Sequence, residues 1–196
     1  CLIGSQYETQ RGHTLPRHPL FNRVEDNHIH HCGAFDTYAA GIFLGLSQGN
    51  TVSHNRIEEM PHHGICLGDS GYGRNIVEYN EIRRVCREIM DTGAINFWMH
   101  DPGKYARREA ERSGHVIRYN LIADLHGCRV DDNGELLPSP YVQAIYLDNM
   151  SSNCFVYGNI VLRSPTGIWV NMGKNNFIEN NVFVDCTCGF QCGAWH

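Results

Sequence analysis

The sequence predicts an all-β solenoid in which short strands stack coil upon coil around one shared core. One pattern recurs six times along the 196 residues, and the apolar positions within each copy alternate with a period of two. Each strand is short and is bounded by Gly, Asn, Asp or Pro. Period-two alternation favours strands over helices, and a recurring unit of about 20–50 residues is typical of stacked repeats. We therefore expect about six coils.

Each copy reads apolar-x-x-Asn-x-apolar, followed after a variable turn by Gly or Ala and a second short apolar strand. The repeated asparagines are Asn27, Asn55, Asn80, Asn120, Asn159 and Asn181. An asparagine at a turn can bond backbone groups and tolerate left-handed dihedral angles, and stacked asparagines also bond one another. We therefore expect these six residues to hold the coils together rather than to bind a ligand.

The composition is ordinary for a soluble globular domain, with 42 % hydrophobic residues, 19 % charged residues and a formal net charge of -5. Nucleic acid binding would need a concentrated basic face, which is lacking. No apolar run approaches the ~18 residues that cross a membrane, and no signal peptide opens the chain. Because the chain begins at Cys1 without a methionine, we expect residues 1–196 to be one domain of a longer protein, with coils from about 21 to 192.

Nine cysteines are spread over the chain. We expect most of them to be small buried hydrophobic residues, because free cysteine is among the most buried residue types. Zinc binding by Cys186, Cys188 and Cys192 is a second interpretation, although their C-x-C-x3-C spacing lacks a further ligand pair. Disulfide bonds between some of the cysteines are a third interpretation.

Two insertions interrupt the repeat, at about residues 99–114 and 125–141. The first is rich in charged residues, and the second contains Asp131, Asp132 and Gly134. Long loops in compact folds are usually functional or disordered. Because the insertions belong to adjacent coils, we predict that they wall a cleft over the sheet face at residues 144–148.

The strands beside the insertions carry aromatic, amide and carboxylate groups between their apolar residues. If the apolar residues point inward, the residues between them point outward on one sheet face. Two outward rows then run from coil to coil: Trp98, Asp148 and Asn171 in one, and Asn96, Tyr146 and Trp169 in the other. Aromatic rings offer flat apolar area to sugar rings, while carboxylates and amides bond to hydroxyls. The predicted ligand is therefore a polysaccharide or oligosaccharide.

Asp148 and Asp91 are the candidate catalytic pair. Glycosidic cleavage uses two carboxyl groups, ~5 Å apart in retaining enzymes and ~6.5–9.5 Å apart in inverting ones, with one kept protonated. Aligning the two strands places Asp148 beside Trp98 but Asp91 beside Tyr141, roughly 20 Å away, and alternation turns Asp91 inward. Spacing alone therefore favours a turn residue at Asp91, and only a bend near residues 92–93 would return it to the outer face.

The repeat resembles the right-handed parallel β-helix family over nearly the whole chain. The segments Asp91-Thr92-Gly93-Ala94-Ile95 and Ile145-Tyr146-Leu147-Asp148 resemble the Asp-x-Gly-Ala-Ile and Ile-Tyr-Leu-Asp segments of bacterial β-helix glycoside hydrolases of the α-L-fucosidase and xylanase type. This resemblance implies a secreted or periplasmic enzyme that cleaves a complex polysaccharide, with Asp91 and Asp148 as catalytic aspartates. The family often has a second Asp after Leu-Asp, where this chain has Asn149.

Three more residues are candidate substrate contacts at the rim of the cleft. His62 and His63 lie one coil before Asp91, and Glu88 lies just ahead of it. Imidazole titrates near neutral pH and can assist proton transfer. The two histidines also fit as simple turn residues.

Two other functions fit the same repeat. A polysaccharide lyase or epimerase would abstract a proton beside a uronate carboxylate, with a basic group and Ca²⁺. The available groups are Arg83, Arg84, Arg87, Glu88 and Lys104. The outward rows hold no Lys or Arg, which disfavours this function.

The second alternative function is a solenoid that binds carbohydrate without cleaving it, since a fold alone does not imply catalysis. For the hydrolase we predict no metal and no cofactor.

Overall fold

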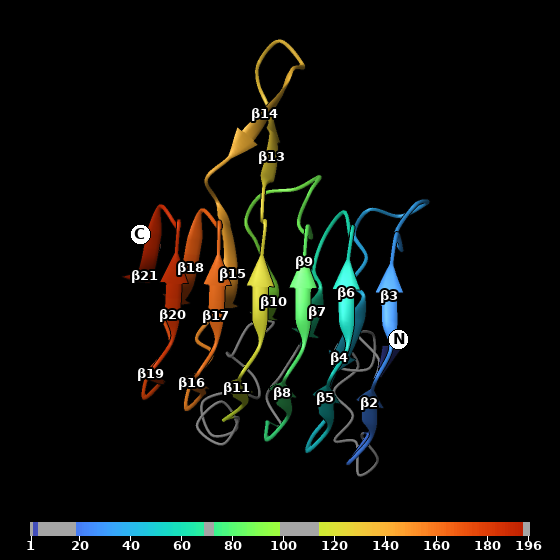
Figure 1. Ribbon diagram of the computed structural model, residues 1–196, viewed down its shortest axis with the longest axis vertical. Helices are drawn as coiled ribbons and strands as arrows, with labels where there is room; N and C mark the ends of the chain where they lie inside the picture. The colour runs from blue at the N-terminus through green and yellow to red at the C-terminus, as the bar shows by residue number, and fades with distance from the viewer. Residues whose placement is uncertain (1, 4–18, 69–72, 99–113, 194–196) are drawn as a thin grey trace, which may run out of the picture.

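The chain forms a right-handed parallel β-helix in which each coil contributes one strand to each of three sheets (Figure 1). The computed structural model describes residues 2–3, 19–68, 73–98 and 114–193. Over these ranges every named element is a strand, and six full coils follow one another. The predicted all-β solenoid of about six coils is confirmed.

The three sheets are built from corresponding strands of consecutive coils, all paired in parallel. Sheet 1 contains β1 (Leu2–Ile3), β4 (Ile42–Gly45), β7 (Ile65–Gly68), β10 (Thr92–Trp98), β15 (Val142–Leu147), β18 (Thr166–Asn171) and β21 (Cys188–Gly193). Sheet 2 contains β2 (Arg23–Glu25), β5 (Thr51–Ser53), β8 (Ile76–Glu78), β11 (Val116–Arg118), β16 (Phe155–Tyr157) and β19 (Phe177–Glu179). Sheet 3 contains β3 (His28–His30), β6 (Arg56–Glu58), β9 (Glu81–Arg83), β12 (Leu121–Ala123), β17 (Ile160–Leu162) and β20 (Val182–Val184).

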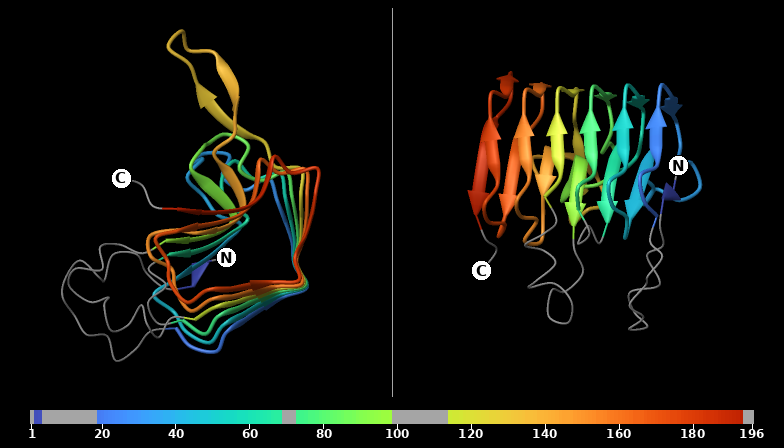
Figure 2. Two further views of the ribbon diagram at one scale, coloured as in Figure 1. Left: turned by 90° about the vertical axis from the view of Figure 1, so that its left-hand side faces the viewer. Right: turned by 90° about the horizontal axis from the view of Figure 1, so that it is seen from below.

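The core is a set of aliphatic columns that run along the solenoid axis. In sheet 1, one column contains Ile65, Ile95, Ile145 and Ile168, which are paired in register and fully buried. Sheets 2 and 3 supply equivalent columns from the valines and isoleucines of the repeat. Because the same inward positions recur in every coil, the coils superpose in the view along the axis (Figure 2).

The six repeated asparagines form a ladder at the turn between sheets 2 and 3. Asn80 Nδ2 donates to Asn120 Oδ1 at 2.9 Å, and Asn120 Nδ2 donates to Asn159 Oδ1 at 3.0 Å. Asn120 Nδ2 also donates to the carbonyl of Val77, which closes the turn of the preceding coil. The predicted structural role of these residues is therefore confirmed.

The left-handed dihedral angles of this turn lie one residue before each ladder asparagine. The residues concerned are Asp26, His54, Tyr79, Tyr119, Gly158 and Asn180, all with positive φ. The ladder asparagine itself keeps an ordinary φ, because its buried amide must stay directed at the next coil. The expectation that these asparagines adopt left-handed dihedral angles is therefore wrong.

A second, interrupted ladder lies at the turn between sheets 1 and 2. Asn22 Nδ2 donates to Asn50 Oδ1, and Asn50 Nδ2 donates to Asn75 Oδ1, both at 2.9 Å. His115 and Cys154 occupy this position in the next two coils, and Cys154 N–H donates to Asn176 Oδ1 in the last. These two replacements hide the second ladder from a search for repeated asparagine.

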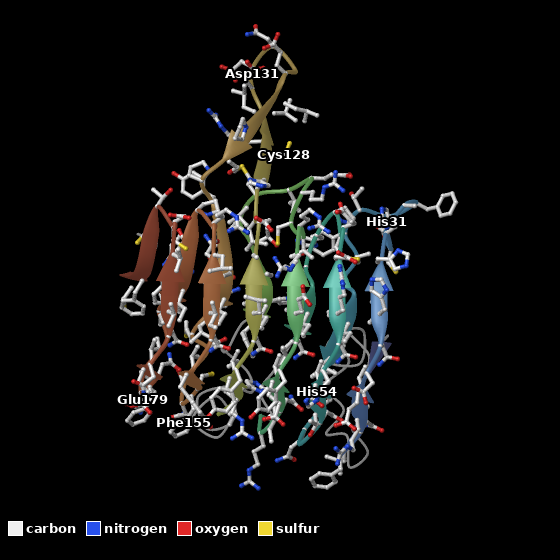
Figure 3. The ribbon with its side chains drawn as sticks, in the orientation of Figure 1. His31, His54, Cys128, Asp131, Phe155 and Glu179 are labelled. Carbon is white, nitrogen blue, oxygen red and sulfur yellow. The ribbon has the colours of Figure 1, made fainter. Side chains whose placement is uncertain are left out.

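The second insertion forms an antiparallel hairpin of β13 (Gly127–Val130) and β14 (Leu136–Ser139) that projects from the solenoid (Figures 1 and 2). Asp131 lies near its tip and Cys128 lower down (Figure 3). The Cys128 N–H donates to the Ile89 carbonyl at 3.1 Å, so the hairpin is tied to the turn that leads into β10. The first insertion, Lys104 included, lies outside the described residues.

Eight cysteines lie in the described ranges, and all carry free thiols. Only Cys66, Cys86 and Cys154 are buried, so the expectation that most are core residues is wrong. The others lie on a turn, on strand β13 of the projecting hairpin or on the last coil. Within the described part of the chain no three His, Cys, Asp or Glu side chains are arranged to hold a metal ion, the last three cysteines included. The same part contains no helix able to span a membrane.

Candidate functional site

Three rows of side chains cross the outer face of sheet 1. The first contains His63, Gly93, Gln143 and Thr166, the second Cys66, Asn96, Tyr146 and Trp169, and the third Gly68, Trp98, Asp148 and Asn171. The pairings Asn96↔Tyr146 and Tyr146↔Trp169 match the register expected from the repeat. The Asp148 N–H donates to the Phe97 carbonyl at 3.0 Å, which places Asp148 level with Trp98.

Much of this face is closed to solvent. Asn96 is 5 % exposed, Tyr146 2 %, Trp169 6 % and Asn171 2 %. The Tyr146 and Trp169 rings stack with centroids 5.2 Å apart and planes 18° apart, so each covers part of the other. Trp98 and Asp148 are half-buried, and the Trp98 ring lies over Gly68, where the lack of a side chain leaves room for it. The face is thus less open than alternation alone led us to expect.

Asp148 is held at the end of β15 by two sets of contacts. Asn171 Nδ2, on the next strand, donates to Asp148 Oδ1 at 2.8 Å. The backbone N–H and the hydroxyl of Ser151 both donate to the Asp148 carbonyl, at 3.2 and 2.7 Å. The turn therefore fixes the backbone while the amide of Asn171 orients the carboxylate along the third row.

Asp91 also reaches this face, because the strand alternation breaks in β10. Ala94 and Ile95 are consecutive and both belong to the buried core. A Cβ atom at Gly93 would lie 2.8 Å from Tyr146 Cβ, so Gly93 is on the same side as Tyr146. Thr92 then faces in and Asp91 out. The inward direction predicted for Asp91 is wrong, since strict alternation fails where the coil bends.

The backbone register of Asp91 nevertheless agrees with the alignment. Its N–H donates to the Tyr141 carbonyl at 2.7 Å, and its φ of 54° is left-handed. From this turn the carboxylate meets the Tyr146 ring, whose hydroxyl donates to Asp91 Oδ1 at 3.3 Å. The long tyrosine side chain therefore spans the part of the strand that separates the two aspartates.

The charge of Asp148 acts on Asp91. Desolvation raises the pKa of Asp91, the negative charge of Asp148 raises it further, and the hydrogen bond from Tyr146 opposes both. Asp91 is exposed by surface area, but the atoms packed around its carboxyl still remove enough water to favour the protonated form. A carboxyl with a raised pKa beside a second carboxyl is the kind of arrangement that acid–base catalysis uses.

His62 and His63 lie at the edge of the first row as a neutral stacked pair. Their ring centroids are 3.6 Å apart, and Tyr38 packs against His62 at 4.6 Å. His63 Nδ1 lies 2.9 Å from Thr92 Oγ1 and 3.0 Å from the Gly93 carbonyl. Burial lowers the pKa of His62 to about 4, and burial together with His62 lowers that of His63 to about 3. They are buried beside the bend that presents Asp91, not at an open rim.

The remaining candidates lie away from the aspartates. Glu88 is exposed, and its N–H donates to the Pro61 carbonyl. Arg83, Arg84 and Arg87 form ion pairs with carboxylates of sheet 3 and of its bordering turns. None of these contacts involves either aspartate.

Gln143, Thr92 and Tyr38 belong to this region but escaped the sequence analysis. Gln143 lies two residues before the inward Ile145, so alternation would assign it to the core, whereas the bend turns it outward beside Gly93. Only the outward register of Gly93 reveals its position. Thr92 and Tyr38 carry no repeat signal, because each makes its contact through the fold of a turn.

The cavity found in the described part of the chain lies at the first coil and not over the sheet face that carries Asp148. It has a volume of about 500 Å³ and is bordered by the first coil, including Val24, His28, His30 and Cys32. A cleft over residues 144–148 therefore stays a prediction.

The comparisons with known proteins bear on the fold alone. A family model described as the right handed beta helix region matches residues 20–108. The comparisons with curated proteins and with solved structures found no match. The match covers the first three coils, and the same parallel register continues through the last three. The chain is thus a right-handed parallel β-helix whose repeats resemble those of that family.

Proposed function

We propose that this β-helix is carbohydrate-active and hydrolyses a glycosidic bond in a complex polysaccharide with Asp91 and Asp148. The observation that carries the proposal is the raised pKa of Asp91, caused by burial and by the charge of Asp148 on the same sheet face. Glycoside hydrolysis needs at least two carboxyl groups, one of which acts as a proton donor.

The surroundings of the pair favour one order of roles, which the sequence leaves open. Asp91, whose pKa is raised by burial and by the charge of Asp148, is the proposed general acid, which protonates the leaving oxygen. Asp148 accepts a hydrogen bond from Asn171 Nδ2 and is the proposed nucleophile or base. Either role uses an oxygen atom of this carboxylate.

The aromatic residues of the face supply the proposed sugar contacts. Trp98 is half-buried in the same row as Asp148, and a flat indole ring offers apolar area to a pyranose. Tyr146, Trp169, Asn96 and Asn171 lie deeper and would shape the floor of the site. His62 and His63 would support that floor from the bend, while Glu88 contributes nothing to this proposal.

The engaged arginines weigh against the lyase alternative. Arg84 is 2.6 Å from Glu58, Arg87 is 2.6 Å from Glu59, and Arg83 is 2.5 Å from Glu81. A lyase needs a free basic group beside the substrate to abstract a proton. These three arginines instead pair with carboxylates of sheet 3 and its turns.

The test is a screen of the purified protein against plant and algal polysaccharides, with released reducing sugar as the readout. Asp148→Asn should abolish turnover and keep the fold, and Asp91→Asn should reduce turnover most for substrates with poor leaving groups. Asp132→Asn, on the exposed hairpin tip, is the matched control and should retain full activity.

Three outcomes would count against the proposal. A fully active Asp148→Asn protein would remove Asp148 from the mechanism. Ultraviolet absorbance from an unsaturated uronate product would establish the lyase in its place. Tight polysaccharide binding without turnover of any substrate would establish a binding solenoid.

A further inference from the structure

The outer face of sheet 1 contains buried hydrogen-bond acceptors that nothing in the described part of the chain satisfies. They are Asn96 Oδ1, Gln143 Oε1 and Asn171 Oδ1, in side chains of residues that are 5 %, 1 % and 2 % exposed. They come from three consecutive strands, β10, β15 and β18. A buried acceptor without a donor costs about 1–3 kcal/mol, so three on one face indicate a ligand that supplies donors.

The orientation of one of these amides is fixed by its neighbour. The nitrogen and the oxygen of an amide differ in that only the nitrogen can donate. Asn171 Nδ2 donates to the Asp148 carboxylate, which can only accept. The oxygen of Asn171 is therefore the atom left without a partner, and it lies beside the carboxylate that is proposed to react.

The charges around these acceptors are negative or absent. Asp91 and Asp148 supply the carboxylates of the face, and both accept hydrogen bonds. The buried pair His62 and His63 remains neutral above about pH 4, the higher of their two lowered pKa values. A ligand carboxylate placed here would meet acceptors and like charge, which is costly when water is excluded.

We infer that this face binds an uncharged sugar unit through its hydroxyl groups and rejects a uronate at the same position. The inference rests on the proposed function and narrows its substrate class. Sugar hydroxyls can donate to the three amide oxygens and to Asp148 together, whereas the carboxylate of a uronate replaces a donor with an acceptor. Specificity then arises from unpaired and repelling groups against the wrong ligand.

Matched pairs of polysaccharides test the inference directly. Polygalacturonate, alginate and glucuronan would each be compared with their carboxyl-reduced forms, which keep the linkage and replace the carboxylate by a hydroxymethyl group. Xylan and xyloglucan complete the panel as neutral glycans. Binding of the full chain would be measured by affinity electrophoresis, and turnover by reducing sugar. We expect binding to neutral members to be at least about tenfold tighter than to acidic ones.

A variant links the preference to the orphan acceptors. Asn96→Leu removes one acceptor while filling its space, and should weaken neutral binding by about tenfold, the value of one hydrogen bond. Asn133→Ala on the exposed hairpin should leave binding unchanged. Because the comparison of matched polysaccharides uses the unaltered protein, it stands even if Asn96→Leu fails to fold.

The outcomes separate this inference from the proposed function. Equal or tighter binding of the acidic forms, or no binding of any neutral glycan, would overturn the inference. Hydrolysis of an acidic polysaccharide that depends on Asp148 would overturn the inference but would agree with the proposed hydrolase function. Preferential binding of neutral glycans without turnover would support the inference and contradict the hydrolase.

Discussion

The Tyr146 hydroxyl donates to the Asp91 carboxylate at 3.3 Å, across 55 residues of sequence. The distance is long for an O–H···O bond, but the contact joins β15 to the turn that opens β10. Tyr146 is itself stacked on Trp169 and lies two residues before Asp148. This one side chain therefore connects the two proposed catalytic residues with the aromatic floor of the face.

Tyr146→Phe should move the alkaline limb of the pH–rate profile to higher pH. The hydroxyl lowers the pKa of Asp91, so its loss lets that pKa rise and keeps the proposed acid protonated further. Phenylalanine retains the stacking on Trp169, which preserves the floor. The measurement is kcat against pH. Tyr157→Phe, on sheet 2, is the control, and an unmoved alkaline limb would contradict the role of the contact.

Asp91→Asn should raise the melting temperature at pH 7 while it removes activity. Burial and Asp148 raise the pKa of Asp91, so the folded state binds more protons than the unfolded state above the ordinary value of 3.8. Stability therefore falls as pH rises through that window, and the neutral amide escapes this loss. Thermal unfolding at pH 7 and pH 3 checks the sign. The gain should vanish at pH 3, and a lower melting temperature at pH 7 would contradict it.

Gly93→Ala should destabilise the fold by about 1–3 kcal/mol, the usual cost of overpacking. The added methyl would lie 2.8 Å from Tyr146 Cβ and 3.0 Å from the Ile95 carbonyl. Gly193→Ala offers a matched control on the same sheet, because nothing lies within 4 Å of its Cβ position. Denaturant unfolding of both variants gives the comparison. Equal stabilities would mean that Gly93 has no steric role at the bend.

Asn120→Ala should cost about 3 kcal/mol or more. The substitution removes the side-chain partners of the Val77 carbonyl and of the Asn80 N–H, each worth roughly 1–3 kcal/mol when buried, while Asn159 Oδ1 keeps its bond from the Asn120 backbone N–H. Asn133→Ala, at the exposed hairpin tip, should stay within about 0.5 kcal/mol of the wild type. Urea unfolding measures both. A mild effect at Asn120 would show that the ladder is dispensable.

His62→Phe should make the stability of the protein fall less steeply as the pH is lowered from 7 to 4. Burial lowers the pKa of His62 to about 4, below its ordinary 6.5. The unfolded state therefore binds more protons between these values, and stability falls as pH drops through this window. Phenylalanine keeps the stacking with His63 and Tyr38 but cannot titrate. Melting temperatures from pH 7 to pH 4 test this, with exposed His126→Phe as control. An unchanged slope would exclude His62 as its source.

The repeat predicted the fold because a solenoid converts local patterns into tertiary structure. Each coil has the same inward positions, so Ile95 and Ile145 could be placed in register from spacing alone. The repeat also predicted the asparagine ladder between sheets 2 and 3. It did not predict the second ladder, because His115 and Cys154 replace asparagine in two of its coils.

The candidate site was predictable where strands run straight and failed where they bend. Trp98, Asp148 and Asn171 lie in the row that alternation assigns to them. Asp91 was assigned inward, because a single period of two was carried through Ala94. Burial of Tyr146 and Trp169, and the neutral state of the histidines, depend on neighbours from other coils that no spacing reveals.

The sequence by itself determined the stacked strands, their register and the outward position of Asp148, since all three depend on a periodicity that each coil repeats. Only the tertiary structure decided that Asp91 shares the face with Asp148. The consecutive inward residues Ala94 and Ile95 shift the alternation by one at the corner of the coil. Two consecutive inward residues break the period of two, so alternation by itself cannot place a side chain that lies beyond the corner.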